Sequence, residues 1–167
     1  MGNARKSIAT KMKTLEARCR ERGYPVTVQR RVIFETLLHR SDHPTIDQVY
    51  EDVKNRISGV SRTTVYRTLE TLAELGVAKK TSHFGAVTRF DRNMDHHHHL
   101  VCMGCDKVVD LEDAGLKSIR LPVARHIGFD IVDFSIYFEG VCHECRKLRS
   151  ENQSRIASRS KRAMQKQ

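Results

Sequence analysis

Two pairs of cysteines with the same spacing give this sequence its clearest chemical signal. Cys102 and Cys105 form the first pair, Cys142 and Cys145 form the second, and two residues separate the cysteines of each pair. This spacing lets both sulfurs of a pair turn toward one ion, and two such pairs supply a tetrahedral zinc site. Redox pairs or disulfides are the alternative interpretation. Four thiolates leave no open position on the metal, so we expect a structural Zn²⁺.

A run of four histidines, His96, His97, His98 and His99, lies just before the first cysteine pair. Alternate residues of a strand face the same way, so His97 and His99 share one face. His96 and His98 share the other face. One such pair can bind a metal together with carboxylates from elsewhere in the chain. A solvated run of histidines that binds nothing is the alternative.

The basic charge of the chain is concentrated in its N-terminal half. The net charge is +10, and residues 1–90 contain 17 Lys and Arg against 9 Asp and Glu, whereas residues 91–149 contain 8 against 10. A basic half joined to a near-neutral half suggests binding to a polyanion such as nucleic acid, although a basic balance can also serve solubility alone. Without an apolar signal segment or a run of membrane-span length, we expect a cytoplasmic protein. There, paired cysteines favour metal binding over disulfides.

The periodicity of apolar residues predicts four helices followed by a hairpin in the basic half. The first helix covers residues 4–22, and Cys19 is expected to pack in the core on its apolar face. The next three helices begin at residues suited to cap them, Thr27, Thr45 and Ser61. Two strand-like segments, residues 77–81 and 86–90, follow the fourth helix. This order predicts a winged helix-turn-helix domain whose fourth helix enters the major groove of DNA.

The rest of the chain has a mixed pattern that predicts a small α/β dimerisation domain, so the fold class is α+β. Its expected elements are strands at 98–102 and 107–111, a helix near 112–127 and a strand at 131–142. Pro122 should kink or split that helix. These elements cannot bury much core alone, which favours a homodimer. The expected regions are a DNA-binding domain at 1–90, a hinge at 91–95, a metal-binding dimerisation domain at 96–149 and a basic, disordered tail at 150–167.

These motifs together resemble the ferric uptake regulator family over about residues 8–148. The similar segments are VTVQRRVIFETL, HPTIDQVYEDV, SRTTVYRTLETLAELGVAKK, TRFD, HHHHLVCMGCDKVVDLED and GVCHEC. The resemblance implies a transcriptional repressor that binds DNA with a regulatory metal. The regulatory ligands that it implies are His43, Asp91, His97, His99 and Asp110. A metal bound by residues of both domains would favour a dimer whose two fourth helices match successive major grooves of a palindromic, AT-rich operator.

The ligand types indicate a branch of the family. Imidazoles and carboxylates without a thiolate suit Fe²⁺ or Mn²⁺ better than Zn²⁺ or Cu⁺. Position 91 is typically Asp in the peroxide-sensing branch and Glu in the iron-responsive branch, so Asp91 favours a peroxide sensor, with an iron-responsive repressor as the alternative. The resemblance then implies His43 or His97 as the residue that peroxide oxidises to 2-oxo-histidine. A further metal site of some iron-responsive members is absent, because Lys117 and Phe134 replace its ligands.

Base contacts are expected at the start of the fourth helix. The candidates are Arg62, Thr63, Thr64, Tyr66 and Arg67. The resemblance places Tyr66 against thymine methyl groups and Arg67 on the DNA backbone or a base, and a core position is the alternative for Tyr66. Lys13 of the first helix would neutralise a backbone phosphate.

Two other classes of function explain fewer of these features. A zinc-dependent hydrolase would need an open metal position, a general base and a substrate pocket, and the sequence has no HExxH motif. A metal-buffering protein would explain the histidines and cysteines but not the segment TTVYRTL. We therefore expect a metal-dependent, DNA-binding repressor rather than an enzyme.

Overall fold

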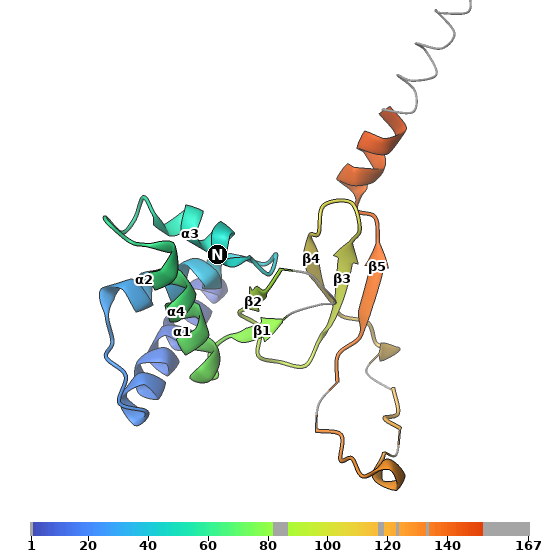
Figure 1. Cartoon of the computed structure of the whole chain (residues 1–167), viewed down its shortest axis with the longest axis horizontal. Coiled ribbons are helices and arrows are strands. Elements are labelled where there is room, and N and C mark those ends of the chain that lie inside the picture. The colour runs from blue at the N-terminus through green and yellow to red at the C-terminus, as the bar shows by residue number, and fades with distance from the viewer. Residues whose placement is uncertain (1, 82–86, 117–118, 123, 133, 152–167) are drawn as a thin grey trace, which may run out of the picture. The chain divides into compact units, whose positions relative to one another are not determined.

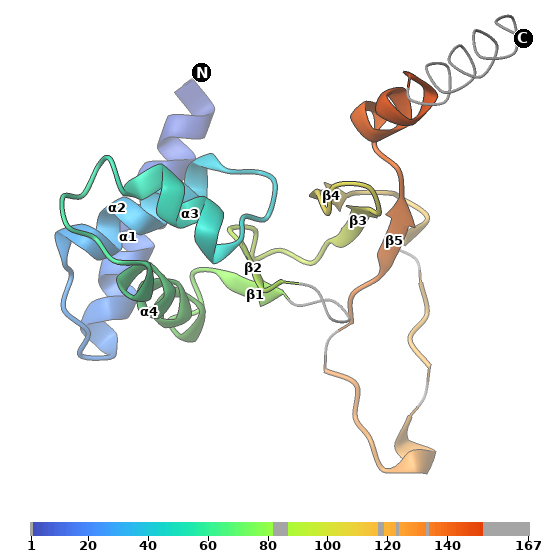
Figure 2. The same ribbon diagram turned by 45° about the horizontal axis from the view of Figure 1, so that its top comes forward.

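The computed structural model describes residues 2–81, 87–116, 119–122, 124–132 and 134–151 of the chain. These residues belong to two compact units, Met1–His96 and His97–Gln167 (Figures 1 and 2). The first unit carries four helices and a two-stranded sheet, and the second is built on a three-stranded sheet, as far as the described residues extend. Within those residues no helix combines the length and the apolarity needed to cross a membrane.

The four predicted helices of the first unit are confirmed. They are α1 (Gly2–Glu21), α2 (Val28–His39), α3 (Ile46–Val53) and α4 (Arg62–Glu74). Each predicted cap is in place: the hydroxyl of Thr27 accepts from the N–H of Arg30, and that of Ser61 accepts from the N–H of Thr64. Thr45 forms a complete capping box with Gln48, which satisfies two otherwise unpaired N–H groups at the start of α3.

One apolar core joins the helices of the first unit. Leu15 and Cys19 of α1, Phe34 of α2, Leu69 of α4 and Phe90 are all almost completely buried in it. The expected core position of Cys19 is thereby confirmed. Because this core fixes the helices against one another, side chains at the start of α4 and in the loops between helices have a rigid support.

The predicted hairpin follows α4 as strands β1 (Lys79–Thr81) and β2 (Arg89–Asp91), which pair antiparallel. Both strands are shorter than expected, and β2 extends one residue further, to Asp91. The turn residues predicted at 82–85 lie outside the described part of the chain. Helices followed by this hairpin form a winged helix-turn-helix, as predicted.

The sheet of the second unit has the strand order β4-β3-β5. Strand β3 (His98–Cys102) lies in the centre, β4 (Val108–Leu111) pairs with it antiparallel, and β5 (Tyr137–Gly140) pairs with it parallel. The register sets His99 opposite Asp110 on one side and Tyr137 on the other. After β5, residues 143–151 are helical.

The prediction of a helix near residues 112–127 is wrong for the residues described there. A turn begins the segment, in which the carboxylate of Asp113 accepts from the N–H of Gly115 at 2.7 Å. Further on, among the described residues, the short 3-10 helix η2 (Arg125–Ile127) forms and ends at Gly128 with φ 81°. Pro122 lacks an N–H and disfavours helical backbone at the residue before it, so a continuous helix cannot pass through this point.

Two further boundaries differ from the prediction. The strand expected at 131–142 is limited to β5. Residues 150 and 151, assigned to a disordered tail, continue the helix that starts at residue 143. The rest of the predicted tail, 152–167, lies outside the described residues.

Candidate metal centres and DNA-binding helix

The second unit brings its four predicted zinc ligands together. The sulfurs of Cys102, Cys105, Cys142 and Cys145 all lie within 4.8 Å of one another. The sulfurs of Cys105 and Cys142 are 3.8 Å apart, too far for a disulfide, and all four cysteines are free thiols. A tetrahedral zinc ion with Zn–S bonds of about 2.3 Å places its sulfurs about 3.8 Å apart. The donor set and the spacing therefore fit Zn²⁺.

Hydrogen bonds within this four-cysteine centre prepare Cys102 as a thiolate. The backbone N–H groups of Cys142 and Gly104 donate to its sulfur at 3.2 and 3.3 Å, and they lower the pKa of the Cys102 thiol to about 6. The Cys145 thiol donates to the Cys142 sulfur, which raises the pKa of Cys145 to about 12. The two shifts favour a thiolate at Cys102 and a retained thiol proton at Cys145. A divalent metal replaces such protons when it binds.

The backbone of the first cysteine turn leaves room only for a glycine at position 104. A Cβ atom there would lie 2.8 Å from the Cys145 sulfur and 3.0 Å from the Cys145 Cβ. Asp106, which follows the turn, has φ 56°, and its N–H donates to the carbonyl of Cys102 at 2.8 Å. The chain is thus folded tightly around the sulfurs rather than passing loosely beside them.

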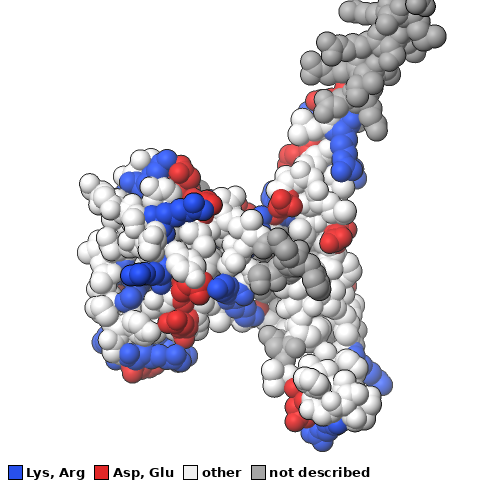
Figure 3. All heavy atoms as spheres, in the orientation of Figure 1, with Lys and Arg blue, Asp and Glu red and all other residues white. Residues whose placement is uncertain are grey.

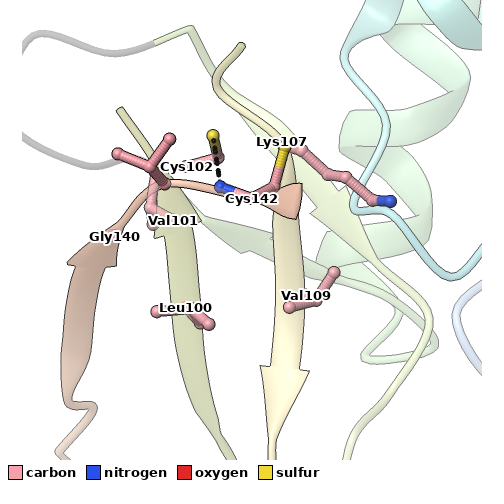
Figure 4. A pocket seen from close by; sticks show the side chains of 8 residues that line it. Leu100, Val101, Cys102, Lys107, Val109, Gly140 and Cys142 are labelled. Carbon is pink, nitrogen blue, oxygen red and sulfur yellow. Dashed lines mark hydrogen bonds between the residues drawn. The ribbon is translucent and has the colours of Figure 1, made fainter. Parts of the chain in front are cut away.

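The strands hold the two cysteine turns side by side. Cys102 ends β3 and lies opposite Gly140, the last residue of β5. Figure 4 shows the resulting hydrogen bond from Cys142 to the Cys102 sulfur, above a small pocket of about 130 Å³. Leu100 and Val109 line this pocket. The parallel pairing of β3 with β5 therefore brings the two cysteine turns together.

The predicted regulatory ligands divide between the two units, and two of them meet in the first. His43 lies in the loop between α2 and α3, and Asp91 ends β2. Both side chains are buried, and the Nε2 atom of His43 is 3.5 Å from the Oδ2 atom of Asp91. An imidazole nitrogen and a carboxylate oxygen held this close can bind one divalent cation.

The other three predicted ligands meet in the second unit. The Nε2 atom of His97 is 3.6 Å from the Oδ1 atom of Asp110, and the rings of His97 and His99 are 4.6 Å apart. The ring of His99 also stacks on Tyr137 at 5.0 Å. His98 faces away from this group, as its alternation predicted, and its Nδ1 accepts from the N–H of Ile136 at 3.4 Å.

The residues predicted to contact bases begin α4. Tyr66 is 44% exposed, so the alternative that it belongs to the core is wrong. Arg62, Thr63 and Arg67 are also exposed, whereas Thr64 is half-buried and its N–H is the donor to the Ser61 cap. Arg62 forms an ion pair with Asp47 of α3. A DNA contact by Arg62 would therefore have to compete with this ion pair.

On the face drawn in Figure 3, basic side chains are spread over the first unit with acidic ones between them. Lys13 of α1 is exposed, as a phosphate contact requires. Its neighbour Lys11 instead donates to the carbonyl of Arg92 at 2.9 Å. Lys13 is therefore the better candidate for a DNA contact, because it is exposed, whereas the ammonium group of Lys11 is already bound to the carbonyl of Arg92.

Comparison with known proteins matches residues 21–139 to the ferric uptake regulator family. The chain is 34% identical over 128 residues to the peroxide operon regulator of Bacillus subtilis, covering 77% of this chain and 88% of that one. A solved zinc-bound manganese uptake regulator is 29% identical, with a TM-score of 0.63 over 77% of this chain and 98% of the other. The Campylobacter jejuni peroxide stress regulator is also 29% identical, with a TM-score of 0.56 over 68% and 85%.

Fold and sites together define a winged-helix regulator with a four-cysteine metal centre. The chain belongs to the ferric uptake regulator family. Because this is a family of regulators, the chain is a transcriptional regulator and not an enzyme. The hydrolase interpretation is thereby excluded.

Two residues of these sites escaped the sequence analysis, Gly104 and Arg89. Gly104 stands inside the first cysteine pair, and its position there was the available signal. Arg89 belongs to the segment TRFD, yet its contact with the carbonyl of His43 joins segments far apart in the sequence. Nothing in the spacing of residues could have indicated that contact.

Proposed function

We propose that this protein is a peroxide-responsive repressor whose regulatory metal, Fe²⁺ or Mn²⁺, is bound by His43, Asp91, His97, His99 and Asp110. The observation that carries the proposal is the oxygen and nitrogen donor set: His43 pairs with Asp91 in the first unit, and His97 with Asp110 in the second. Such a set without thiolate favours Fe²⁺ and Mn²⁺ over Zn²⁺. The relatives named as peroxide regulators add support.

In this proposal the five ligands couple metal binding to DNA binding. Two of them belong to the unit that carries α4, and three belong to the unit that carries the four-cysteine centre. Binding of one ion by both sets restricts the angles between the DNA-binding domain, 1–90, and the dimerisation domain, 96–149, around residues 91–95. A homodimer restricted in this way presents two α4 helices at the spacing of successive major grooves.

Peroxide sensing follows from the imidazole ligands. An Fe²⁺ ion held by these residues would supply one-electron chemistry: one electron passes to hydrogen peroxide as its O–O bond breaks and one returns from the oxidised imidazole, so the iron is unchanged overall. His43 or His97 then gains one oxygen atom at the ring carbon between the two nitrogens, so that one imidazole and one hydrogen peroxide give 2-oxo-histidine and one water. The oxidised ring is a poorer ligand, and its loss frees the two units from each other and lowers the affinity for the operator.

Peptide mass spectrometry after stoichiometric peroxide tests this proposal. Trypsin releases residues 41–54, in which His43 is the only histidine and no Met or Cys is present. A gain of one oxygen on this peptide therefore reports on His43 without interference from methionine oxidation. The peptide 93–107 contains four histidines and two methionines, so a gain there must be located by fragmentation.

The peptide 32–40 is a matched internal control. It contains the exposed His39 and also lacks Met and Cys. We expect oxygen on His43 or His97, only in the Fe²⁺ form, while His39 and the Mn²⁺ form stay unmodified. If the Fe²⁺ protein stays unmodified and keeps its DNA affinity, the peroxide function is wrong and an iron-responsive repressor takes its place. Equal oxidation of His39 would indicate diffusing oxidant rather than a ligand reaction.

We further propose that the protein acts in the cytoplasm on a palindromic, AT-rich operator, with bases contacted from Arg62, Thr63, Thr64, Tyr66 and Arg67. Arg67→Ala should weaken operator binding by about 1–3 kcal/mol if the guanidinium forms a bidentate base contact. Lys13→Ala should instead weaken binding to all sequences alike and lower the salt dependence by about one counterion. Gel shifts with the Mn²⁺ form at several salt concentrations measure both effects. Unchanged affinity in Arg67→Ala and Tyr66→Ala would contradict the assignment of α4.

A further inference from the structure

The loop that carries His43 has an unusual backbone conformation. His43 has φ 48°, in the left-handed region that residues other than glycine seldom adopt. Such a conformation persists only where surrounding contacts impose it. The contacts around this loop therefore decide whether the imidazole is held in one position or samples several.

Arginine side chains and a capping box fix both ends of this loop. Arg40 donates to both carboxylate oxygens of Asp42, at 2.9 and 2.6 Å, and to Asp52 of α3 at 2.6 Å. Thr45 closes the other end through its capping box with Gln48.

Arg89 connects the middle of the same loop to the strand that carries Asp91. Its guanidinium donates to the carbonyl oxygen of His43 at 3.0 Å. Next to this bond, the N–H of Phe90 donates to the carbonyl of Pro44 at 3.0 Å, and Arg89 forms an isolated antiparallel bridge with Thr45. Arg89 lies two residues before Asp91 on β2, so its side chain adds to these backbone contacts and ties the carbonyl of His43 itself to the strand that carries Asp91.

The carboxylate of Asp91 is also held in one orientation. Its Oδ1 atom accepts from the N–H of Asn93 at 2.7 Å, while its Oδ2 atom faces Nε2 of His43. The following residue, Arg92, donates to the carbonyl of Leu38 at the end of α2 at 2.7 Å. Within the first unit, these contacts therefore fix the backbone that carries His43 and the direction of the Asp91 carboxylate.

We infer that Arg89 is a positioning residue that holds the His43–Asp91 pair ready for the regulatory metal. This inference rests on the proposed function, in which His43 and Asp91 are ligands. A pair held in advance binds metal without first ordering the loop, so affinity is higher than for a loop that samples other conformations. Residues that orient ligands commonly change metal affinity by about 10–100-fold when they are replaced.

Direct Mn²⁺ binding to the purified, zinc-loaded full chain tests the role of Arg89. Electron paramagnetic resonance of unbound Mn²⁺ gives the affinity without any DNA. Arg89→Met keeps most of the aliphatic stem and removes every donor, and we expect it to weaken Mn²⁺ binding by about tenfold or more. Arg89→Lys restores one cationic donor and should lie between the parent and Arg89→Met. Zinc content should stay the same in both variants.

Arg56→Met is the matched control for a loss of stability alone. Arg56 donates to the Thr36 hydroxyl at 2.8 Å and to Glu35 at 2.5 Å, in the same unit but away from the His43 loop. We expect this variant to lower the melting temperature while Mn²⁺ affinity stays at the parental value. A similar loss of Mn²⁺ affinity in Arg56→Met and Arg89→Met would overturn the positioning role.

The outcomes separate this inference from the proposed function. Parental Mn²⁺ affinity in Arg89→Met, together with weakened binding in His43→Asn, overturns the role of Arg89 and leaves the regulatory site standing. Parental affinity in His43→Asn would instead overturn the regulatory site itself. If Arg89→Met does not fold, Arg89→Lys decides by the same criterion: weakened Mn²⁺ binding supports the inference and parental affinity overturns it.

Discussion

The four-cysteine centre and the His43–Asp91 pair are built in opposite ways. Each cysteine pair lies within one turn of the chain, and the sulfurs are held mainly by N–H groups of the same two turns. His43 and Asp91 come from different elements, and side chains from elsewhere, above all Arg89, fix their segments. The first kind of site is built from two local turns joined by strand pairing, whereas the second depends on side-chain contacts across the domain.

This difference matches the roles that the two sites can have. A centre with four thiolate ligands has no free coordination position, so its metal stabilises the fold. Imidazole and carboxylate ligands spread over several segments can respond to which metal is present and to oxidation of a ligand. Variants that affect one site and spare the other therefore test the comparison.

Loss of a cysteine ligand should have the largest effect. Cys142→Ser removes one of four sulfurs, and we expect loss of zinc and of the folded second unit, because structural zinc contributes about 10–16 kcal/mol to such folds. Zinc content per chain and the oligomeric state measure this directly. Cys19→Ala, in the core of the first unit, is the control and should keep its zinc. A stable dimer with one zinc per chain in Cys142→Ser would refute the assignment.

Loss of the imidazole at position 43 should remove metal response and leave zinc in place. His43→Asn suits this test, because Asn tolerates the positive φ at this position better than most residues. Since a direct ligand is lost, we expect Mn²⁺ affinity to fall by more than about 100-fold, beyond the range for residues that only orient ligands. His39→Asn serves as control. Loss of zinc in His43→Asn would show that the two centres are not independent.

A methyl group at position 104 should weaken zinc binding without removing a ligand. In Gly104→Ala the new Cβ would lie 2.8 Å from the Cys145 sulfur, so one cysteine turn must move. We expect about tenfold faster loss of zinc to a chelator, comparable to disturbing a residue that orients a ligand. Met103→Ala changes an exposed side chain of the same turn and should lose zinc at the parental rate. Equal rates in all three proteins would contradict the tight fit.

Loss of a capping hydroxyl should have the smallest effect. Thr45→Ala removes the acceptor at the start of α3 and should lower the free energy of unfolding of the first unit by about 1 kcal/mol. Urea unfolding monitored by circular dichroism measures this change. Thr45→Ser keeps the hydroxyl and should behave like the parent protein. If Mn²⁺ binding weakens by more free energy than the unfolding free energy falls, the Thr45 cap also helps to position His43.

The sequence predicted the helical half of the fold well and the second half only in part. Helix caps such as Thr45 and Ser61 act over three or four residues, so their effect is local and could be inferred from the sequence. The helix expected at 112–127 was wrong: Pro122 was expected only to kink or split it, and the turn at Asp113 opposes its start as well. In this segment, the backbone restrictions of proline and of the Asp113 turn outweighed the helical spacing of apolar residues.

By itself, the sequence determined the two cysteine pairs, because a two-residue spacing already brings both sulfurs of a pair to one side of a turn. The pairing of β3 with β5 then joins the two turns into one centre. The sequence also determined which side chains could serve as regulatory ligands, through their chemical types. Only the tertiary structure decided that Arg89 reaches the carbonyl of His43 and that His43 keeps a left-handed backbone beside Asp91. Those contacts join segments far apart in the chain, and their geometry exists only once the core has packed α2, α3 and β2 together.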